Sequence, residues 1–98
     1  MWRQGDIFIR AIPAVPQEAV ARPLPHTVLA HGELTGHSHR VVDPAALFAG
    51  DGCFYLDVRV DQARVVHDEH GTITLDRGVY RVWRQREYTP QRIVTVQD

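Results

Sequence analysis

The sequence is short of the features that define several classes of protein. It has one cysteine, Cys53, so an intramolecular disulfide is excluded. No apolar stretch approaches the ~20 residues of a membrane-spanning helix, and the residues after Met1 lack the apolar segment of a signal peptide. A single cysteine is compatible with a reducing compartment. We therefore expect a cytoplasmic protein in which Cys53, set in an apolar run, is a buried thiol.

An excess of charge of either sign is also missing. Lysine and asparagine are absent, all 11 basic residues are arginines, and 12 acidic residues leave a formal net charge of −1. A chain without a basic excess is not expected to bind nucleic acid or anionic membranes through charge alone. The sequence leaves a small-molecule ligand, a protein partner and a homo-oligomer open.

The 98 residues, 44% of them hydrophobic, are enough for one domain with its own core. Apolar residues mostly alternate with polar ones in short segments rich in β-branched and aromatic residues. We expect residues 1–98 to form a single all-β domain, a small antiparallel barrel or sandwich of about seven strands with one short helix. The expected strands cover residues 6–12, 27–30, 37–42, 54–60, 63–67, 72–75 and 79–84, with a weaker one at 93–96.

Three segments between these strands carry other local signals. Residues 43–48 predict a short helix, with Asp43 as N-cap and Pro44 at the first helical position. Residues 13–25 are rich in proline, which favours an ordered loop, although residues 17–21 could form one helical turn. Residues 76–78 predict a tight turn.

The most informative feature is a set of two histidine pairs, Gly36-His37-Ser38-His39 and His67-Asp68-Glu69-His70. On a strand, residues i and i+2 point to one face, so His37 and His39 have the spacing of a bidentate metal ligand. His67 and His70 share a face only if the strand ends in a turn between them. If the fold brings the pairs together, we expect His37 and His39 to lie within ~8 Å of His67 or His70.

We therefore expect a metal site with His37, His39, His67 and His70 as ligands and Glu69 as a general base or additional ligand. Imidazole and carboxylate ligands suit one divalent transition metal: zinc first, with iron, nickel or copper as alternatives. An open coordination position would suit a metal-dependent hydrolase or an oxygen-using enzyme. Asp6 is a further carboxylate candidate, whereas His26 and His31 belong to neither pair and are expected to be structural.

Two other classes of function remain open. One is a metal-free phosphodiesterase-type enzyme in which two histidines act as acid and base and an arginine stabilises a phosphate. The other is a non-enzymatic interaction module that docks through exposed aromatics such as Trp2 or Trp83.

Arginines and aromatic residues are interleaved near the C-terminus. Guanidinium groups in such a cluster could form an anion site. The arginine–aromatic spacing also suits single-stranded nucleic acid, but the chain lacks the basic excess that such binding normally uses. With a net charge near zero, we favour pairing with nearby acids on a solvated face, Asp57, Asp61, Asp76 and Glu87. The arginines are Arg77, Arg81, Arg84, Arg86 and Arg92, with Tyr80, Trp83 and Tyr88 among them.

Four segments, RQGD at 3–6, GHSH at 36–39, HDEH at 67–70 and RQREY at 84–88, carry a resemblance. The chain resembles a group of small uncharacterised bacterial proteins with the pattern RQGD, GHxH, HxxH and RQREY. The resemblance spans nearly the whole chain and implies no activity. A looser likeness to the cupins implies only a β-barrel metal site by analogy, because no Glu follows His39 at the cupin spacing and no His follows Gly78.

Overall fold

The structure, a computed structural model, describes residues 1–31 and 37–85. Nearly all of this part of the chain is β-strand, which confirms the expected all-β class. The elements are β1 Trp2–Gln4, β2 Ile7–Ile12, α1 Gln17–Val20, β3 Pro23–Leu24, β4 Val28–His31, β5 Ser38–Val41, β6 Ala45–Ala49, β7 Phe54–His67 and β8 His70–Arg84.

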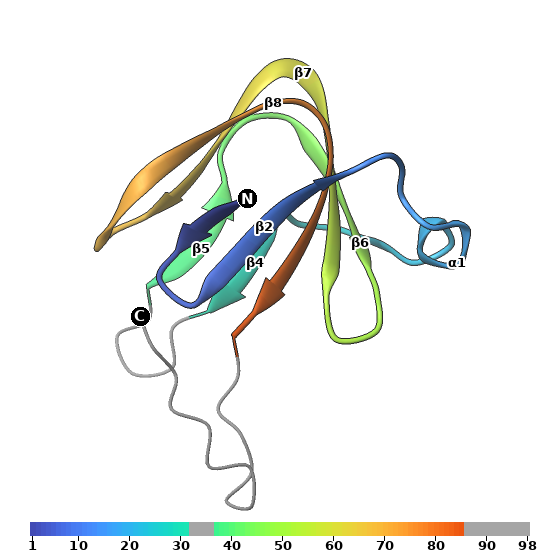
Figure 1. The fold of residues 1–98 in the computed structure, drawn as a ribbon, viewed down its shortest axis with the longest axis horizontal. Helices are drawn as coiled ribbons and strands as arrows, with labels where there is room; N and C mark the ends of the chain where they lie inside the picture. Colours follow the sequence, from blue (N-terminus) through green and yellow to red (C-terminus); the bar gives the residue numbers. More distant parts are fainter. Residues whose placement is uncertain (32–36, 86–98) are drawn as a thin grey trace, which may run out of the picture.

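The strands form one antiparallel sheet that curls into a half-barrel (Figure 1). The order across the sheet is β1-β2-β8-β7-β5-β4, and β6 joins β7 and β3 off this path. The long strands β7 and β8 run side by side and bend together before they end in a hairpin. Because β7 bends, its two halves pair with different neighbours: residues 54–58 pair with β6, and Val65 and Val66 pair with β5.

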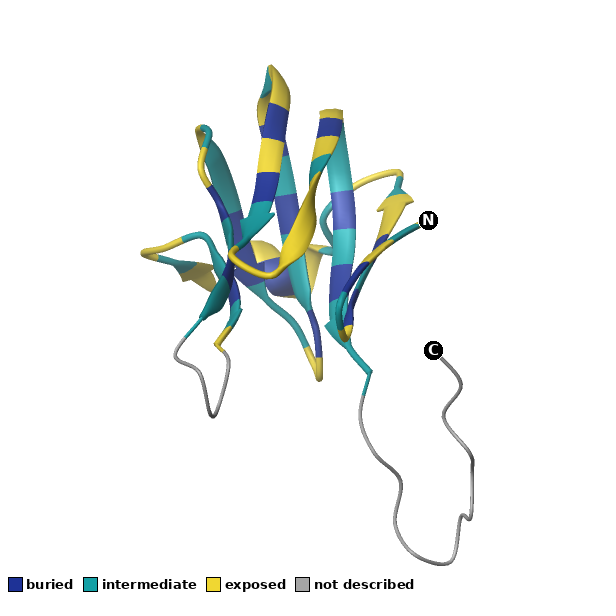
Figure 2. Ribbon diagram, turned by 90° about the vertical axis from the view of Figure 1, so that its left-hand side faces the viewer, coloured by how far each residue is buried: buried dark blue, intermediate teal, exposed yellow. Residues whose placement is uncertain are grey.

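The core lies on the concave side of the curled sheet. Buried residues alternate with more exposed ones along much of β2, β5 and β7, as Figure 2 shows for the sheet. The largest fully buried side chains are aliphatic, and each contributes about 1.5–3 kcal/mol by leaving water. They are Ile7, Ile9, Leu47, Leu56, Val58, Val65, Leu75 and Val82.

The prediction of a helix at residues 43–48 is wrong. Ala45–Ala49 instead forms strand β6, which pairs with β7. The Asp43 carboxylate does not cap a helix. It accepts hydrogen bonds from the Arg64 backbone N–H (2.8 Å) and from the Arg64 guanidinium (3.0 and 3.1 Å). Pairing with β7 thus overrides the local helix signal. The short helix of the described residues is α1, Gln17–Val20. It lies in the proline-rich segment 13–25, at the place where one helical turn was considered possible.

The prediction of a tight turn at residues 76–78 is also wrong, because strand β8 continues through these residues without a break. Gly78 allows the bend at this point, because its φ of 153° is one that side-chain-bearing residues rarely adopt. The two segments expected at 54–60 and 63–67 are likewise one strand, with a register shift between Val58 and Gln62. Strands β1 and β3 were not expected, and the strand expected at 93–96 lies outside the described residues.

Candidate functional site

The four paired histidines lie together at one end of the half-barrel, where His39 is buried and His70 is exposed. His39 on β5 continues the inward-facing column of Val41, and His67 at the end of β7 continues that of Val65. His70 begins β8 on the far side of the hairpin turn. The register of β7 and β8 shifts between Val65 and His67, so that His67 pairs with His70. A register shift of this kind changes the direction in which the neighbouring side chains point.

The fold brings the two pairs together, as their spacing predicted. The ring of His67 is central, with its centroid 4.3 Å from that of His39, 4.7 Å from that of His70 and 5.8 Å from that of His37. The rings of His39 and His70 are stacked with centroids 6.0 Å apart. All these separations are inside the expected limit of ~8 Å. We call these four residues the histidine cluster.

Gln4 on β1 determines which nitrogen of His39 carries a proton. The Gln4 amide donates both of its N–H groups to backbone carbonyls, those of Val65 and Gly71, each at 2.9 Å. Its Oε1 therefore faces His39 Nδ1, 2.8 Å away, and can only accept a hydrogen bond. His39 must then hold its proton on Nδ1, which leaves a lone pair on Nε2 when the ring is neutral.

The lone pair of His39 has an anionic neighbour. Asp6 Oδ1 lies 3.6 Å from His39 Nε2, while Asp6 Oδ2 is 2.8 Å from Arg84 Nε. Arg84 also donates to the carbonyl of His31 at 2.8 Å. Arg84 thus holds the Asp6 carboxylate beside the histidine cluster.

Burial keeps His39 neutral. Its exposed fraction is 4%, and its pKa is lowered from 6.5 to about 4, first by burial and then by the neighbouring charge of His67. Asp6 acts in the opposite direction but does not restore the pKa. At neutral pH two electron-pair donors, His39 Nε2 and Asp6 Oδ1, therefore lie 3.6 Å apart. A cation placed between them would be attracted by both.

The hairpin turn adds two more carboxylates. His37 Nε2 lies 3.5 Å from Asp68 Oδ2, and His37 Nδ1 lies 3.6 Å from Glu69 Oε2. The backbone N–H of Glu69 donates to His67 Nδ1 at 3.0 Å. When neutral, His67 therefore carries its proton on Nε2. His37 is the ring most closely surrounded by acidic groups.

The turn between β1 and β2 packs directly on the histidine cluster. Gly5 has a φ of 60°, and a Cβ at this position would lie 2.8 Å from His70 Nε2. Only glycine combines this backbone conformation with so close an approach. The turn therefore brings Gln4 and Asp6 to the histidines.

These contacts do not yet form a closed set of metal ligands. Within residues 1–31 and 37–85, no group of three or more His, Cys, Asp or Glu side chains is arranged so that it could hold a metal ion. The nitrogen positions agree with this finding, because His67 Nδ1 is engaged by Glu69 and both nitrogens of His37 lie near carboxylates. Ion binding would require some of these rings to turn.

The sequence interpretation missed Gln4 and the role of Arg84. The one signal for Gln4 was its place in the RQGD segment, two positions before Asp6, since a long polar side chain gives no sign of burial. Its exposed fraction is only 2%. Among the C-terminal arginines, Arg77 pairs with Asp61 as expected, whereas Arg84 pairs with Asp6. Residues 86–98 lie outside the described residues.

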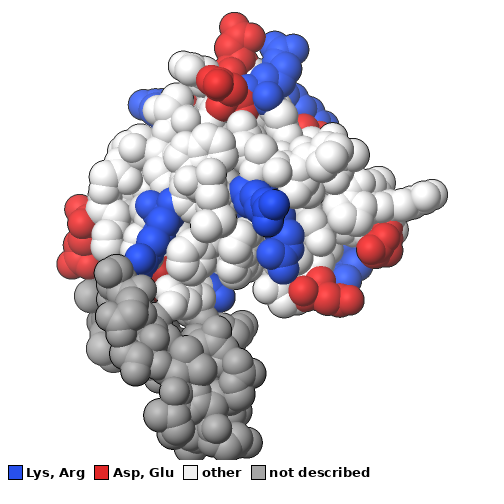
Figure 3. Space-filling model, viewed as in Figure 1, with Lys and Arg blue, Asp and Glu red and all other residues white. Residues whose placement is uncertain are grey.

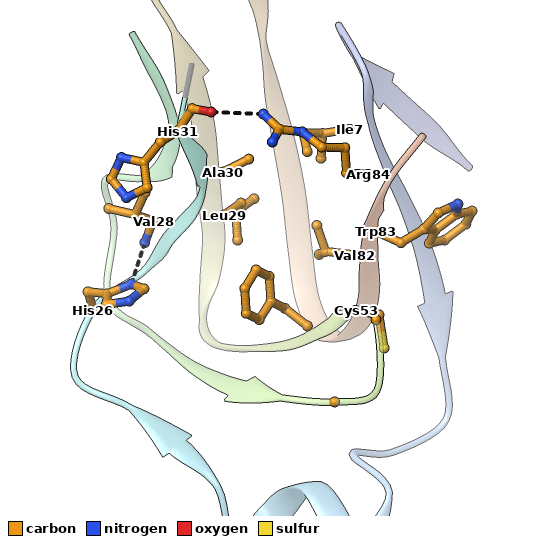
Figure 4. Close-up of a pocket in the computed structure, with 13 residues that line it drawn as sticks. Ile7, His26, Val28, Leu29, Ala30, His31, Cys53, Val82, Trp83 and Arg84 are labelled. Carbon is orange, nitrogen blue, oxygen red and sulfur yellow. Dashed lines mark hydrogen bonds between the residues drawn. The ribbon is translucent and has the colours of Figure 1, made fainter. Parts of the chain in front are cut away.

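A cavity of about 440 Å³ opens between β4 and β8 (Figure 4). Apolar side chains such as Leu29 and Val82 line it, together with Arg84, His31 and His26. His26 Nδ1 accepts a hydrogen bond from the Val28 N–H at 3.1 Å, so this histidine has a structural contact outside the histidine cluster. Cys53 also borders the cavity and is buried, as expected.

Fold and site together define a small, curled antiparallel β domain with a histidine cluster at one end of its interior. A family model described as a domain of unknown function, DUF8820, matches residues 3–85. The chain belongs to this family, which agrees with the resemblance to small uncharacterised proteins. No curated protein and no solved structure matches the chain. None of the helices in the described part of the chain is long and apolar enough to cross a membrane.

Proposed function

We propose that the histidine cluster binds one divalent transition-metal ion, zinc in the first place, with iron, nickel or copper as alternatives. The ligands are drawn from His37, His39, His67 and His70, and Asp6 supplies a carboxylate. The observation that carries this proposal is the pair of electron-pair donors, His39 Nε2 and Asp6 Oδ1, that lie 3.6 Å apart beside the imidazoles of His67 and His70.

The hydrogen bonding of His39 supports the proposal. A metal-ligating histidine usually donates its second ring N–H to a carbonyl or carboxylate, which orients the ring. Gln4 Oε1 accepts such a bond from His39 Nδ1. Metal binding also requires a neutral imidazole, and the lowered pKa of His39 meets this requirement at neutral pH.

Binding would change the conformation of the hairpin turn more than that of the sheet. His67 is free to present Nδ1 to an ion once the ring turns away from the Glu69 N–H, and terminal ring torsions of histidine are broad. This movement would also release Glu69, which we propose as a general base beside the ion. An ion with an open position supplies a polarised water, which suits hydrolysis or oxygen chemistry.

The test is metal titration of untagged protein, followed by calorimetry and elemental analysis. We expect about one equivalent per chain. His70→Ala should weaken binding at least about tenfold, and because His70 is exposed, its loss leaves the core intact. His26→Ala is the matched control and should leave the affinity unchanged. Protein that stays metal-free with Zn²⁺, Ni²⁺, Fe²⁺ and Cu²⁺, or equal losses in both variants, would overturn the proposal.

The lone pair of His39 also fits a second candidate, a metal-free enzyme in which His39 accepts a proton from the substrate. A general base works best with a pKa near the working pH, and a pKa of about 4 makes His39 a weak base at pH 7. We therefore rank this function below metal binding. Cleavage of a simple phosphodiester that persists in EDTA would reverse the ranking.

A further inference from the structure

The outer face of the sheet carries a second organised group of side chains, opposite the core. In the register of β2 and β8, Phe8 lies beside Trp83, and Arg10 lies beside Arg81. The next strand, β7, places Tyr55 beside Arg81. Ile7, Ile9 and Val82 alternate with these residues and are buried, so the group points outward. We call Phe8, Arg10, Tyr55, Arg81 and Trp83 the arginine–aromatic face.

The aromatic rings and guanidinium groups of this face are stacked. The rings of Phe8 and Trp83 lie 5.6 Å apart with planes at 25°. The Arg81 guanidinium carbon is 4.7 Å from the centre of the Trp83 ring. The guanidinium carbon of Arg3, on β1, is 5.5 Å from the centre of the Phe8 ring. The Arg81 guanidinium lies over the Trp83 ring and also interacts with the Tyr55 hydroxyl, and with five N–H groups it can still donate to an anion.

The charge of this face is not neutralised by carboxylates in the described part of the chain. Several of the acidic residues there pair with other arginines, as in Asp57 with Arg59 and Asp61 with Arg77. No carboxylate of residues 1–31 or 37–85 lies within ion-pair distance of Arg10 or Arg81. In Figure 3 basic atoms occupy the middle of the front face, and acidic atoms lie mainly toward its margins. A net charge near zero therefore conceals a local basic area.

We propose that the arginine–aromatic face binds single-stranded nucleic acid. Flat aromatic rings stack on bases of any sequence, and arginine contacts the phosphates and stacks as well. The face supplies both within a few strand positions. The sequence interpretation found that the arginine–aromatic spacing suits single-stranded nucleic acid but did not favour it, because the chain lacks a basic excess.

The same observations argue against a membrane surface as the partner. Docking on lipid requires apolar side chains that reach into the bilayer. The large exposed hydrophobic residues in the described part of the chain are Met1, Val20 and Val42, none of which belongs to the arginine–aromatic face.

The test is fluorescence anisotropy of a labelled oligothymidylate, measured with the whole chain in EDTA at low salt. We expect saturable binding that weakens with salt, with a slope of about −0.7 per phosphate contacted. Trp83→Ala should weaken binding at least about fivefold, because stacking of one base is lost. Arg81→Gln and Arg10→Gln should each weaken binding and reduce the salt slope.

Arg59→Gln is the matched control, since it removes the same charge from an arginine that pairs with Asp57. It should leave the affinity unchanged, and Trp83→Phe should retain most of the binding if the variant is folded by circular dichroism. Absence of binding at low salt would overturn the proposal, as would equal losses in Arg59→Gln and Arg81→Gln. Binding to anionic vesicles but not to the oligonucleotide would also overturn it. Because EDTA is present, failure of metal binding does not affect the result.

Discussion

The histidine cluster and the arginine–aromatic face involve the same sheet but are built in different ways. Contacts in the cluster join residues far apart in the chain: Gln4 bonds to His39, Val65 and Gly71, at separations of 35, 61 and 67 positions. The residues of the arginine–aromatic face, such as Phe8 and Trp83, are just as far apart in the chain, but they meet directly as neighbours in strand register. A polar site inside the barrel therefore depends on several buried hydrogen bonds at once, whereas an outward face depends only on alternation and pairing.

The largest expected effect that tests this difference is that of Gln4→Leu. The substitution leaves the His39 N–H and the carbonyls of Val65 and Gly71 without their partner. Because unsatisfied buried groups are costly, we expect a loss of roughly 3–5 kcal/mol in the free energy of unfolding. Urea denaturation at neutral pH measures it.

Two controls make the comparison sharp. Gln62→Leu removes an exposed hydrogen bond to Asp76 and should change stability by no more than about 0.5 kcal/mol. Arg81→Gln, on the arginine–aromatic face, should cost about 1 kcal/mol or less. If either variant is as destabilised as Gln4→Leu, the contrast between the two regions does not hold.

The second prediction concerns pH. Because the pKa of His39 is about 4 in the folded protein and 6.5 when unperturbed, the unfolded chain binds a proton more readily. The folded state should therefore lose stability as pH falls from about 6.5 to 4, by roughly 3 kcal/mol from this group. Urea denaturation in EDTA at a series of pH values measures the loss.

His39→Gln serves as the control for the pH dependence, because it removes the titrating ring and should flatten the curve in this range. An NMR titration of the His39 ring gives its pKa independently of stability. Parallel curves for the two proteins, or a ring that titrates near pH 6.5, would show that burial does not control the ionisation of His39.

The smallest expected effect is that of alanine substitutions at two glycines, which distinguish backbone strain from contact with the histidine cluster. Gly5 and Gly52 both have positive φ, 60° and 70°, but only Gly5 has a neighbour, His70, where a Cβ would be placed. Gly52→Ala should cost about 1 kcal/mol from strain alone. Gly5→Ala should cost about 1–2 kcal/mol and should also weaken metal binding. Identical stabilities and metal affinities for the two variants would mean that the β1–β2 turn does not support the cluster.

The sequence alone was sufficient for the class of fold and for the identity of the clustered histidines. Alternation along residues 6–12, 54–60 and 79–84 predicts strands because one face must be buried, and all three segments are strand. The spacing of His37 and His39 predicted a shared face, and His67 does lie beside both rings. These properties are local, since they follow from the geometry of an extended chain.

Features that depend on pairing between distant segments could be found only in the tertiary structure. Residues 43–48 carry a helix signal, but pairing with β7 makes strand β6 of Ala45–Ala49. Gln4 is an unremarkable polar residue until the sheet places it between β5 and the β7–β8 hairpin, where it bonds to His39, Val65 and Gly71. His70 reaches the cluster through a register shift that no local pattern encodes. Hydrogen bonds across a sheet are selected by the register of the whole barrel, and one strand's sequence does not contain that register.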